Sequence, residues 1–446
     1  MRPQSVIQPK EKRIRNFHEV CLGYPKRLAL EEARRYPQSR ETLDGNACPL
    51  GIDIPGFMRR LREGDAQGAL AIIREKNPMP GVCGRICPAP CENSRGLPSQ
   101  KFVNIRSLER FAADNARGKF PKKISAVTSK VAVVGSGPAG LAAAYELAMA
   151  GYKVTIFETL DKAGGVLRYG VPEFRLPSKV LDEEIKNILR LSVDLRLNCF
   201  VGQTIRLEDL WQDGYQAVLL STGSGVPRLL DIPGANLSGV YYGEEFLMRI
   251  NTMRLKLFGK PAESHCPIGP RVVVIGSGNT ALDSARSARR LGCQVKLAFV
   301  RSESEMRVDP QELALAKEEG IALIPFARPV ELIGHDSGDV KAVKISKVKD
   351  DTAASGSNDE MVVEADTVVI AVGHHPNVWL KKFIPDLELN DDRSLKVDPQ
   401  TAMTSVKGVF AAGNVVLNGG AVVYAMAAGQ SAAEKIKNYT QQAQKL

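Results

Sequence analysis

Two short glycine-rich segments carry a pattern that binds the phosphates of a nucleotide. The first, residues 135–140, reads GSGPAG, and the second, residues 276–281, reads GSGNTA. The first glycine of such a turn allows a tight bend, the second lets the backbone approach a pyrophosphate, and the third lets helix and strand pack closely. Ala281 replaces the third glycine in the second segment, which is an accepted variant. The helix that follows offers free N–H groups and a partial positive charge to the phosphates.

Each turn lies where the chemistry requires it, between a β-branched strand and an alanine-rich helix. Residues 130–159 and 271–301 both read as strand, turn, helix and second strand, about 140 residues apart. That spacing is domain-sized, so the duplication predicts two nucleotide-binding βαβ units. Glu158 ends the second strand of the first unit, where a carboxylate binds the hydroxyl pair of a ribose. Two such units in one chain predict a flavoprotein that binds FAD and a nicotinamide nucleotide.

Cysteines suggest a second kind of chemistry. Five of the eight cysteines lie in the first third of the chain: Cys21, Cys48, Cys83, Cys87 and Cys91. The sequence shows no secretory signal, so we expect a reducing, cytoplasmic compartment and metal or redox chemistry rather than a disulfide framework. Pro88 and Pro90 break any helix through the last two of these cysteines, which favours a ligand loop.

Composition sets the frame for these sites. The chain has 446 residues, of which 44% are hydrophobic and 25% charged, which predicts two to four globular domains. Residues 1–128 hold 24 basic and 13 acidic side chains, a net charge of +11, whereas the remainder has a net charge of −1. This asymmetry fits a docking face for an acidic protein partner, with a solvated basic surface as the plain alternative. We expect neither nucleic-acid binding nor a membrane span.

The first 125 residues are arginine-rich and mostly helical in pattern. Residues 57–74 predict an amphipathic helix that is interrupted near Gly64. After residue 130 the pattern changes to apolar strands and glycine-rich turns. The expected fold class is α/β, with an α-helical domain at the N-terminus.

A resemblance extends this interpretation. Residues 164–186, GGVLRYGVPEFRLPSKVLDEEIK, closely resemble the flavin-side segment of the glutamate synthase small-subunit family. Further landmarks of that family match along nearly the whole chain: FHEVCLGY from Phe17, CPLGIDIP from Cys48, CGRICPAPC from Cys83, STGS from Ser221, AVGHHPN from Ala371 and GVFAAGN from Gly408. The family includes related NADPH oxidoreductase subunits and part of dihydropyrimidine dehydrogenase.

The resemblance implies a glutathione-reductase-like flavoprotein with two Rossmann-like domains and an N-terminal iron–sulfur domain. It implies a [4Fe-4S] domain over 1–125, an FAD-binding domain over 126–265 and 380–446, and an NAD(P)-binding domain over 266–379. The implied FAD contacts are Gly135, Gly137, Pro138, Ala139, Gly140, Glu158, Gly165, Arg168, Thr222, Gly223, Gly413 and Asn414. The implied nucleotide contacts are Gly276, Gly278, Asn279, Thr280, Arg301 and Arg307. Asn414 replaces the usual aspartate of the family, which removes a charge but keeps hydrogen-bonding capacity, so we expect FAD to be retained.

Members of the family carry two [4Fe-4S] clusters in the N-terminal domain. The ligand positions of one cluster are occupied here by Tyr36, Ser39, Asp44 and Arg95, none of which is a cysteine. The resemblance therefore implies that this cluster is lost. Asp44 and Arg95 have opposite charges, and we hypothesise that they pair in the vacated space.

The second cluster keeps its full ligand set. Its positions are occupied here by Cys48, Cys87 and Cys91, and the fourth position, a carboxylate or amide on a following helix, matches Glu109. Thiolates suit iron–sulfur chemistry. Three buried free thiols, or a zinc ion held by the same ligands, remain the alternatives, and Cys83 matches no ligand position of the family.

The choice between NADH and NADPH is less sharply indicated. Relatives that use NADPH have an Arg-Arg pair followed by another arginine, where this chain has Val300-Arg301 and Glu303. Each lost arginine–phosphate contact removes about 1.5–3 kcal/mol, and Glu303 would repel a 2′-phosphate. We lean towards NADH, but Arg301 and Arg307 leave NADPH open.

These patterns predict an oxidoreductase subunit that moves electrons between NAD(P)H and a partner redox protein through FAD and one [4Fe-4S] cluster. No cysteine pair lies beside residues 164–176, which argues against the chemistry of a disulfide reductase. Because the chain has no substrate domain, we expect a hetero-oligomer in which the partner docks near the basic N-terminal domain. The alternatives are the glutamate synthase small subunit itself, or a non-catalytic nucleotide-binding scaffold.

Overall fold

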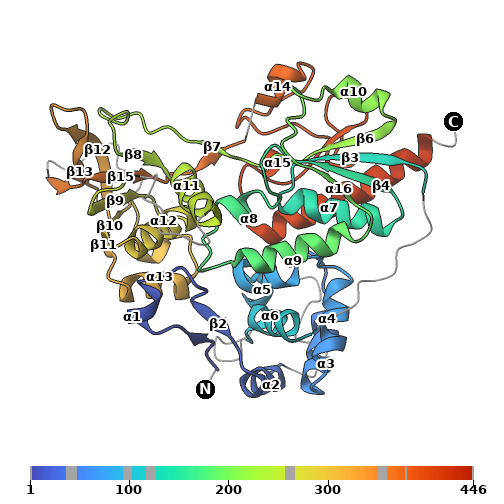
Figure 1. Ribbon diagram of the computed structural model, residues 1–446, viewed down its shortest axis with the longest axis horizontal. Coiled ribbons are helices and arrows are strands. Elements are labelled where there is room, and N and C mark those ends of the chain that lie inside the picture. Colours follow the sequence, from blue (N-terminus) through green and yellow to red (C-terminus); the bar gives the residue numbers. More distant parts are fainter. Residues whose placement is uncertain are drawn as a thin grey trace.

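The protein is described by a computed structural model that covers residues 3–36, 48–93, 103–116, 127–256, 267–348, 359–376 and 379–443. Figure 1 shows two α/β units side by side, with a smaller helical part beneath them. The helical part lies against both units. Among the described residues, no helix is long and apolar enough to cross a membrane.

The first α/β unit is built on a parallel sheet of five strands in the order β17-β6-β3-β4-β5. Its strands are β3 (Lys130–Val134), β4 (Lys153–Phe157), β5 (Asp194–Arg196), β6 (Tyr215–Leu220) and β17 (Val409–Ala411). Its helices are α7 (Pro138–Met149), α8 (Val166–Tyr169), α9 (Ser178–Leu189), α10 (Leu207–Gln212), α14 (Trp379–Phe383), α15 (Asn414–Leu417) and α16 (Val422–Ala443). The central strands are buried on both faces, which explains their continuous runs of β-branched and apolar residues.

The second α/β unit repeats this arrangement with the strand order β11-β10-β9-β15-β8, all parallel. Its strands are β8 (Val240–Tyr242), β9 (Arg271–Ile275), β10 (Gln294–Ala298), β11 (Ala322–Ile324) and β15 (Thr367–Ile370), with an antiparallel sheet of β12 (Ala327–Gly334), β13 (Val340–Lys347) and β14 (Glu360–Glu364). Its helices are α11 (Gly243–Lys256), α12 (Asn279–Arg290), η4 (Glu303–Glu305) and α13 (Pro310–Glu318).

The boundary between the two α/β units does not lie between residues 265 and 266, where the sequence analysis placed it. Strand β8 pairs with β15 at the edge of the second sheet, and α11 packs against α12 of the same unit. The second unit therefore begins before Val240. A three-residue strand carries too little pattern to reveal which sheet it joins. The short antiparallel strands β7 (Val226–Pro227) and β16 (His374–His375) pair with one another in the connections between the two units.

The helical part contains α2 (Lys26–Arg34), α3 (Ile54–Arg62), α4 (Ala66–Arg74), α5 (Pro80–Ile86), η2 (Pro90–Asn93) and α6 (Ile105–Asn115). The predicted helix over residues 57–74 is confirmed with its interruption: α3 and α4 are separated at Gly64, whose φ is +77°. Asp53 and Asp65 cap the two helices by accepting hydrogen bonds from Gly56 N and Gly68 N. The expected boundary between residues 125 and 126 lies outside the described residues.

The N-terminal segment, residues 6–23, precedes the helical part in the sequence and packs against the second α/β unit. It contains β1 (Val6–Ile7) and α1 (Lys10–Arg13), and β2 (Cys21–Gly23) returns to pair with β1. Phe17 and Val20 join the apolar core of the second unit, and Val20 N donates to Phe174 O at 2.9 Å. Nothing in the sequence pattern indicated this docking.

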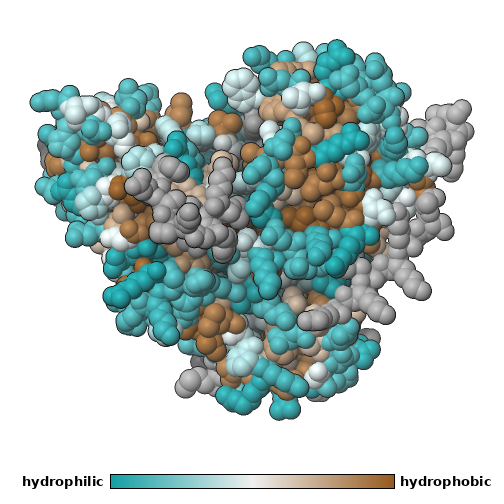
Figure 2. Space-filling model, viewed as in Figure 1, coloured by the Kyte–Doolittle hydropathy of each residue, from teal (hydrophilic) through white to brown (hydrophobic). Residues whose placement is uncertain are grey.

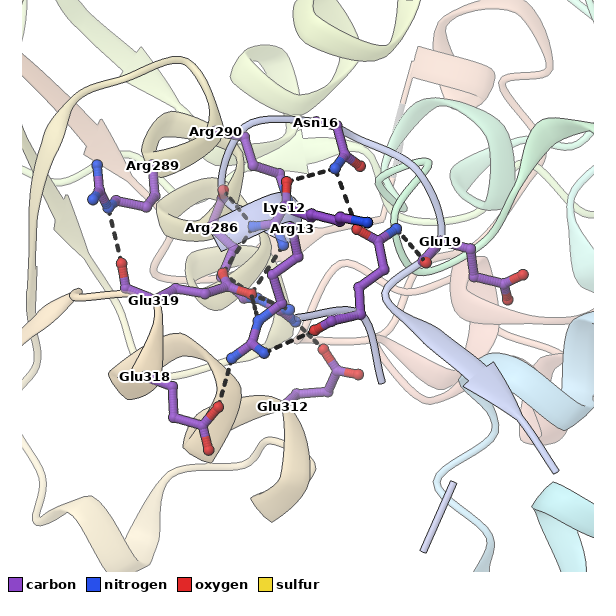
Figure 3. Close-up of polar contacts among 11 residues, drawn as sticks. Lys12, Arg13, Asn16, Glu19, Arg286, Arg289, Arg290, Glu312, Glu318 and Glu319 are labelled. Carbon is purple, nitrogen blue, oxygen red and sulfur yellow. Dashed lines mark hydrogen bonds and ion pairs between the residues drawn. The ribbon is translucent and has the colours of Figure 1, made fainter. Parts of the chain in front are cut away.

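A buried carboxylate fixes the segment in place (Figure 3). Glu319, with no exposed surface, accepts hydrogen bonds from Arg13 at 3.1 Å, from Arg286 at 2.8 and 3.0 Å, and from Arg290 at 2.8 and 2.9 Å. The guanidinium carbons of Arg286 and Arg290 also lie 4.9 and 3.9 Å from the ring centroid of Phe174. Burial by itself raises the pKa of Glu319, but hydrogen bonds from Arg290 and Arg286 outweigh this effect and lower its pKa to about 2.

Replacing Glu319 should therefore destabilise the fold. We expect Glu319→Gln to lower the free energy of unfolding by about 3–5 kcal/mol at neutral pH, because buried Arg290 loses the carboxylate it pairs with. Arg13 and Arg286 each lose one of two carboxylate partners and keep Glu318 and Glu312, respectively. The folded-state pKa is depressed, so the stabilisation is present above the unfolded pKa of about 4.3 and is lost as the pH falls towards 2. The difference in the free energy of unfolding between wild type and variant should therefore become smaller as the pH falls. Denaturant titrations followed by circular dichroism measure both effects.

The matched control is Glu318→Gln. Glu318 is 60% exposed and pairs with the same Arg13, which keeps its bond to Glu319. The control should change stability by less than about 1 kcal/mol. If Glu318→Gln and Glu319→Gln lowered the free energy of unfolding equally, the stabilisation could not be assigned to the buried carboxylate of Glu319.

Candidate functional site

The first glycine-rich turn joins β3 to α7 and depends on the absence of side chains. A Cβ at Gly135, whose φ is +102°, would lie 2.6 Å from Ser221 O, and one at Gly140 would lie 2.0 Å from Gly135 O. At Gly137, by contrast, a Cβ would meet no atom within 4 Å. The outer glycines are thus required by the fold, whereas Gly137 faces open space at the start of α7. Pro138 and Ala139 form the first turn of that helix, where proline costs no hydrogen bond.

Glu158 is buried beside this turn. Its carboxylate accepts hydrogen bonds from Ser136 N at 2.9 Å, Ser136 Oγ at 2.5 Å and Leu160 N at 2.9 Å. Ser136 Oγ in turn accepts from Gly164 N at 3.0 Å, which draws the flavin-side segment towards the turn. The carboxylate is held rigidly at the end of β4, as a ribose-binding acid must be.

Gly165 and Arg168 both belong to the flavin-side segment, residues 164–186. Gly165 lies against the glycine-rich turn, whereas Arg168 pairs with α9. A Cβ at Gly165, whose φ is +53°, would lie 2.9 Å from Gly137 Cα, so the predicted contacts of the two segments meet. The side chain of Arg168 instead turns away from the glycine-rich turn. It donates to Ala163 O at 2.6 Å and pairs with Asp182 of α9, which makes it a brace for the segment. Its role as an FAD contact stays a prediction.

Two polar side-chain atoms of the same region lack partners. Thr222 Oγ1 and Asn414 Oδ1 are buried atoms that form no hydrogen bond among the described residues, whereas Asn414 Nδ2 donates to Gly420 O at 3.5 Å. Gly223 has a φ of +72° with open space where a Cβ would lie, and Gly413, with a φ of +80°, approaches Ala139. A buried polar atom without a partner costs free energy, so these atoms are suited to a bound polar ligand.

Apolar surface surrounds these groups. Val166 of α8, Leu417 of α15 and Tyr424 of α16 are 48%, 46% and 45% exposed. Figure 2 shows brown, apolar atoms gathered over the first α/β unit, where Figure 1 draws α7, α15 and α16. A flat, largely apolar ligand would cover such a surface.

The second glycine-rich turn joins β9 to α12 and has the same construction. A Cβ at Gly276, whose φ is +143°, would lie 2.2 Å from Ala371 O, whereas one at Gly278 would meet nothing within 4 Å. Asn279 and Thr280 begin α12, and Thr280 Cγ2 contacts the start of α11 at Gly243. Both units therefore present one open glycine to a ligand.

The loop from β10 to α13 borders this second turn. Gly278 forms a parallel β-bridge with Arg307, which is exposed. Arg301 is half-buried at the beginning of the loop, and Glu303 pairs with Lys317 at 2.7 Å. The two predicted arginines and the acidic Glu303 thus share one loop beside the turn.

The predicted metal ligands converge on a cavity within the helical part. Cys48, Cys87, Cys91 and Glu109 all line it, and its wall includes Val423 of α16. Helix α5 ends at Ile86, Cys87 is extended, and η2 carries Cys91, as the prolines predicted. Glu109 reaches the cavity from α6.

The cavity holds acidic groups, and none of the described residues that line it is Lys, Arg or His. Burial raises the pKa of Cys87 to about 12, that of Glu109 to about 8, and that of Cys48 above its usual value. Among the described residues, no three His, Cys, Asp or Glu side chains are grouped to hold a single metal ion. A four-iron cluster is larger than a single ion and binds ligands that are more widely separated.

The cavity also contains Asn77, which the sequence argument missed, and Cys83, which it set aside as matching no ligand position. Asn77, fully buried, donates from Nδ2 to Glu109 Oε1 at 2.6 Å and orients that carboxylate. Cys83 lies one helical turn before Cys87, lines the same cavity and contacts Met426 of α16 at 3.6 Å. The four-residue spacing of the two thiols was the available signal for Cys83.

The second set of cluster positions is only partly described. Tyr36 is buried, with Arg62 6.0 Å from its ring centroid. Ser39, Asp44 and Arg95 lie outside the described residues, so the proposed pairing of Asp44 with Arg95 stays a prediction.

Comparisons with known proteins assign these features. The family model "Pyridine nucleotide-disulphide oxidoreductase" matches residues 129–442, and the 4Fe-4S model of dihydropyrimidine dehydrogenase domain II matches residues 13–120. The chain belongs to the pyridine nucleotide-disulphide oxidoreductase family. Its cofactors are FAD, NAD(P)H and a [4Fe-4S] cluster in the N-terminal domain. The resemblance argued from the sequence is thereby confirmed.

Curated relatives cover nearly the whole chain. The beta subunit of NADP(+)-dependent formate dehydrogenase from Moorella thermoacetica is 36% identical, over 89% of this chain and 59% of that subunit. The small chain of glutamate synthase [NADPH] from Azospirillum brasilense is 32% identical, over 97% of this chain and 93% of the relative. The PreT subunit of NAD-dependent dihydropyrimidine dehydrogenase from Salmonella typhimurium is 31% identical, over 95% and 97%.

Solved structures support the fold. FprA from Mycobacterium tuberculosis in complex with NADPH has a TM-score of 0.57 at 20% identity, covering 71% of this chain and 85% of FprA. Thioredoxin reductase from T. acidophilum has a TM-score of 0.51 at 22% identity, covering 70% and 98%. The expected α/β fold with two Rossmann-like sheets is confirmed. The family takes its name from disulfide chemistry, and the described cysteines of this chain form no disulfide with one another.

The residues present fit the cofactors of the family. The open glycines, the unpartnered atoms Thr222 Oγ1 and Asn414 Oδ1 and the apolar border suit a dinucleotide with a flat ring system. Buried thiols beside a carboxylate form a donor set for iron.

The two open glycines allow the sites to be tested separately. Gly137 and Gly278 have φ angles of −71° and −103°, which alanine adopts freely, and an added methyl meets no protein atom. We expect Gly137→Ala to fold normally but to bind FAD about tenfold more weakly or worse, because the methyl occupies space needed by the pyrophosphate. Gly278→Ala should weaken NAD(P) binding by a similar factor and leave FAD in place.

Each variant is the control for the other. Flavin content after dialysis and calorimetric titration with the nicotinamide nucleotide separate the two effects. Loss of FAD from both variants, or from neither, would contradict the assignment of one site to each turn.

Proposed function

We propose that this chain is the electron-input subunit of a larger redox complex, in which electrons pass between NAD(P)H and a partner protein. Members of the family act as NAD(P)H-dependent flavin and iron–sulfur electron-transfer subunits, and this function is shared by the chain. The proposal adds that a single cluster, held by Cys48, Cys87, Cys91 and Glu109, stands between the flavin and the partner.

One observation carries the proposal. The cavity that gathers the four candidate ligands shares a wall with the FAD-binding unit, because Val423 of α16 lines it and Met426 of the same helix contacts the lining residue Cys83. Helix α16 begins at Val422, two residues after Gly420, whose carbonyl accepts from Asn414 Nδ2 at 3.5 Å. One helix thus borders both the flavin-side groups and the ligand cavity, which is the proximity that electron transfer requires.

FAD supplies hydride chemistry with the nicotinamide and single-electron chemistry with an iron–sulfur cluster. The residues of this chain position both. Glu158 and the open Gly137 anchor the nucleotide half of the flavin, Thr222 and Asn414 offer hydrogen bonds, and Asn77 holds the Glu109 carboxylate towards the cavity.

The proposed docking site for the partner protein is inferred from the charge of the helical part. Relatives are subunits of larger complexes, which supports a hetero-oligomer. Lys26 and Arg34 of α2 and Arg59 of α3 are exposed on the helical part, which carries the excess positive charge of the chain. We place docking of an acidic partner on this face, and the association should weaken as ionic strength rises. A glutamate synthase small subunit proper, or a scaffold without catalysis, is the competing function.

Iron and flavin content test the proposal directly. Anaerobically purified protein should contain about four iron atoms and one FAD and should oxidise NAD(P)H with an artificial acceptor. Cys87→Ser should lose the iron while retaining FAD and a folded structure, because the flavin site shares no ligand with the cavity.

Two cysteine variants serve as controls. Cys83→Ser removes a thiol from the same cavity that is not in the proposed ligand set, and Cys199→Ser removes one from the first α/β unit. Both should keep about four iron atoms. Retained iron in Cys87→Ser, or eight iron atoms in the wild type, would show that the ligand assignment is wrong, and a colourless, inactive protein would favour the scaffold.

Nucleotide preference follows from the loop after β10. Glu303 and Glu305 both lie beside Arg301, so we propose that kcat/KM is higher for NADH than for NADPH. Exchanging Glu303→Arg should move the preference towards NADPH, since a guanidinium binds the 2′-phosphate. A tenfold preference of the wild-type protein for NADPH in steady-state kinetics would overturn this proposal.

A further inference from the structure

An arginine of the iron–sulfur domain connects a cluster ligand with the nucleotide-binding unit. Arg106, near the start of α6, donates from one Nη to Cys87 O at 2.9 Å. Its other Nη lies 2.8 Å from a carboxylate oxygen of Asp309, which belongs to the second α/β unit. The two side chains are 23% and 24% exposed, so solvent screens this pair only in part.

Both ends of the connection are fixed by further bonds. On the cluster side, Arg106 N donates to Glu92 Oε1 at 2.9 Å, which ties the start of α6 to η2 and thus to the segment that carries Cys91. On the nucleotide side, Asp309 Oδ1 caps α13 by accepting from Gln311 N at 2.9 Å. The guanidinium and the carboxylate therefore move with their own domains.

Asp309 also ends the loop that borders the nucleotide site. That loop begins at Arg301, and its Arg307 forms the β-bridge to Gly278, the open glycine of the second turn. A dinucleotide bound at the turn would contact the same loop. Its arrival would shift Asp309 relative to Arg106, and hence change the bond that Arg106 makes to the peptide of Cys87.

We propose that the Arg106–Asp309 pair couples the two sites, so that an occupied nucleotide site changes the reduction potential of the cluster. Arg106 acts here as a positioning residue, because it contacts the backbone of the ligand Cys87 rather than the cluster. The positive charge beside the ligand favours the more negative, reduced state of the cluster. By linkage, reduction of the cluster must change nucleotide affinity by the same factor.

The inference rests on the proposed function in one respect, namely that Cys87 is a cluster ligand. It goes further by assigning a role to two residues that neither ligate iron nor form a glycine-rich turn. A purely structural ion pair would hold the domains together without transmitting occupancy from one site to the other.

The test uses the full chain with FAD and cluster and a redox-inert probe, the tetrahydro form of the nicotinamide dinucleotide. The midpoint potential of the cluster is measured by redox titration with EPR detection, with and without saturating probe. We expect a five- to tenfold coupling, which is a shift of about 40–60 mV since a tenfold change equals 59 mV for one electron. Arg106→Gln and Asp309→Asn should each abolish the shift.

Asp309→Asn keeps the proposal testable if the arginine variant fails to assemble its cluster. Asparagine caps a helix as well as aspartate does, so α13 should be retained while the charge is lost. The double variant should behave like either single variant, with no further change in the probe-induced shift, because both substitutions break the same connection.

Arg13→Gln is the matched control. Arg13 also joins α13 to the rest of the chain, through Glu318 and Glu319, but it does not contact the ligand loop (Figure 3). This variant should keep the probe-induced shift. Loss of the shift in Arg13→Gln as well would overturn a specific role for Arg106, because domain orientation alone would then explain the coupling.

The remaining outcomes separate the inference from the proposed function. A cluster signal that the probe does not move in the wild type would overturn the coupling and leave the electron-transfer function standing. Absence of any cluster signal in the wild type would overturn both.

Discussion

Close contact between backbones at α7 is the constraint on which the other features of the molecule depend. A Cβ at Gly140 would lie 2.0 Å from Gly135 O, and one at Gly429 would lie 2.1 Å from Ala139 O. The first contact seats α7 on β3, and the second seats α16 on α7. Helix α16 also supplies Val423 to the lining of the cavity that holds the candidate cluster ligands, and its Met426 contacts Cys83 there. The same helix thus packs against the helix of the flavin-binding turn and against the iron–sulfur domain.

Arginines of low solvent exposure form ion pairs between the parts of the molecule. The helical domain and the N-terminal segment contact the nucleotide unit through Arg106 with Asp309 and through Arg13 with Glu318 and Glu319. Arginine suits these interfaces because its planar fork donates to several acceptors at once while staying charged. Glu319 alone accepts from Arg13, Arg286 and Arg290. The orientation of the domains is therefore determined by a few ion pairs of low solvent exposure rather than by a large apolar interface alone.

Several parts of this architecture could be predicted because local chemistry dictates them. A glycine-rich turn between a β-branched strand and an alanine-rich helix is typical of a nucleotide site. Pro88 and Pro90 prevent one helix from running through both Cys87 and Cys91, so α5 ends at Ile86 and η2 begins at Pro90. Other parts could not be predicted. Strand β8 has only three residues, so its membership of the second sheet depends on pairing with β15, which lies more than a hundred residues later. Arg168 fits a cofactor motif, yet Asp182 on the adjacent α9 determines where its guanidinium points.

The sequence by itself determined the two nucleotide turns, because each is written in residues a few positions apart. The order of the domains and the proposed cluster ligands, which span residues 48–109, came from the resemblance to a known family. The tertiary structure alone decided that Arg13 reaches Glu319, 306 positions away, and that Arg106 lies between Cys87 and Asp309. It also decided that Thr222 Oγ1 and Asn414 Oδ1 are buried atoms without a hydrogen-bond partner among the described residues. Such contacts arise when separate elements pack, and the free energy of a buried charge or hydrogen bond depends on neighbours that no local pattern specifies.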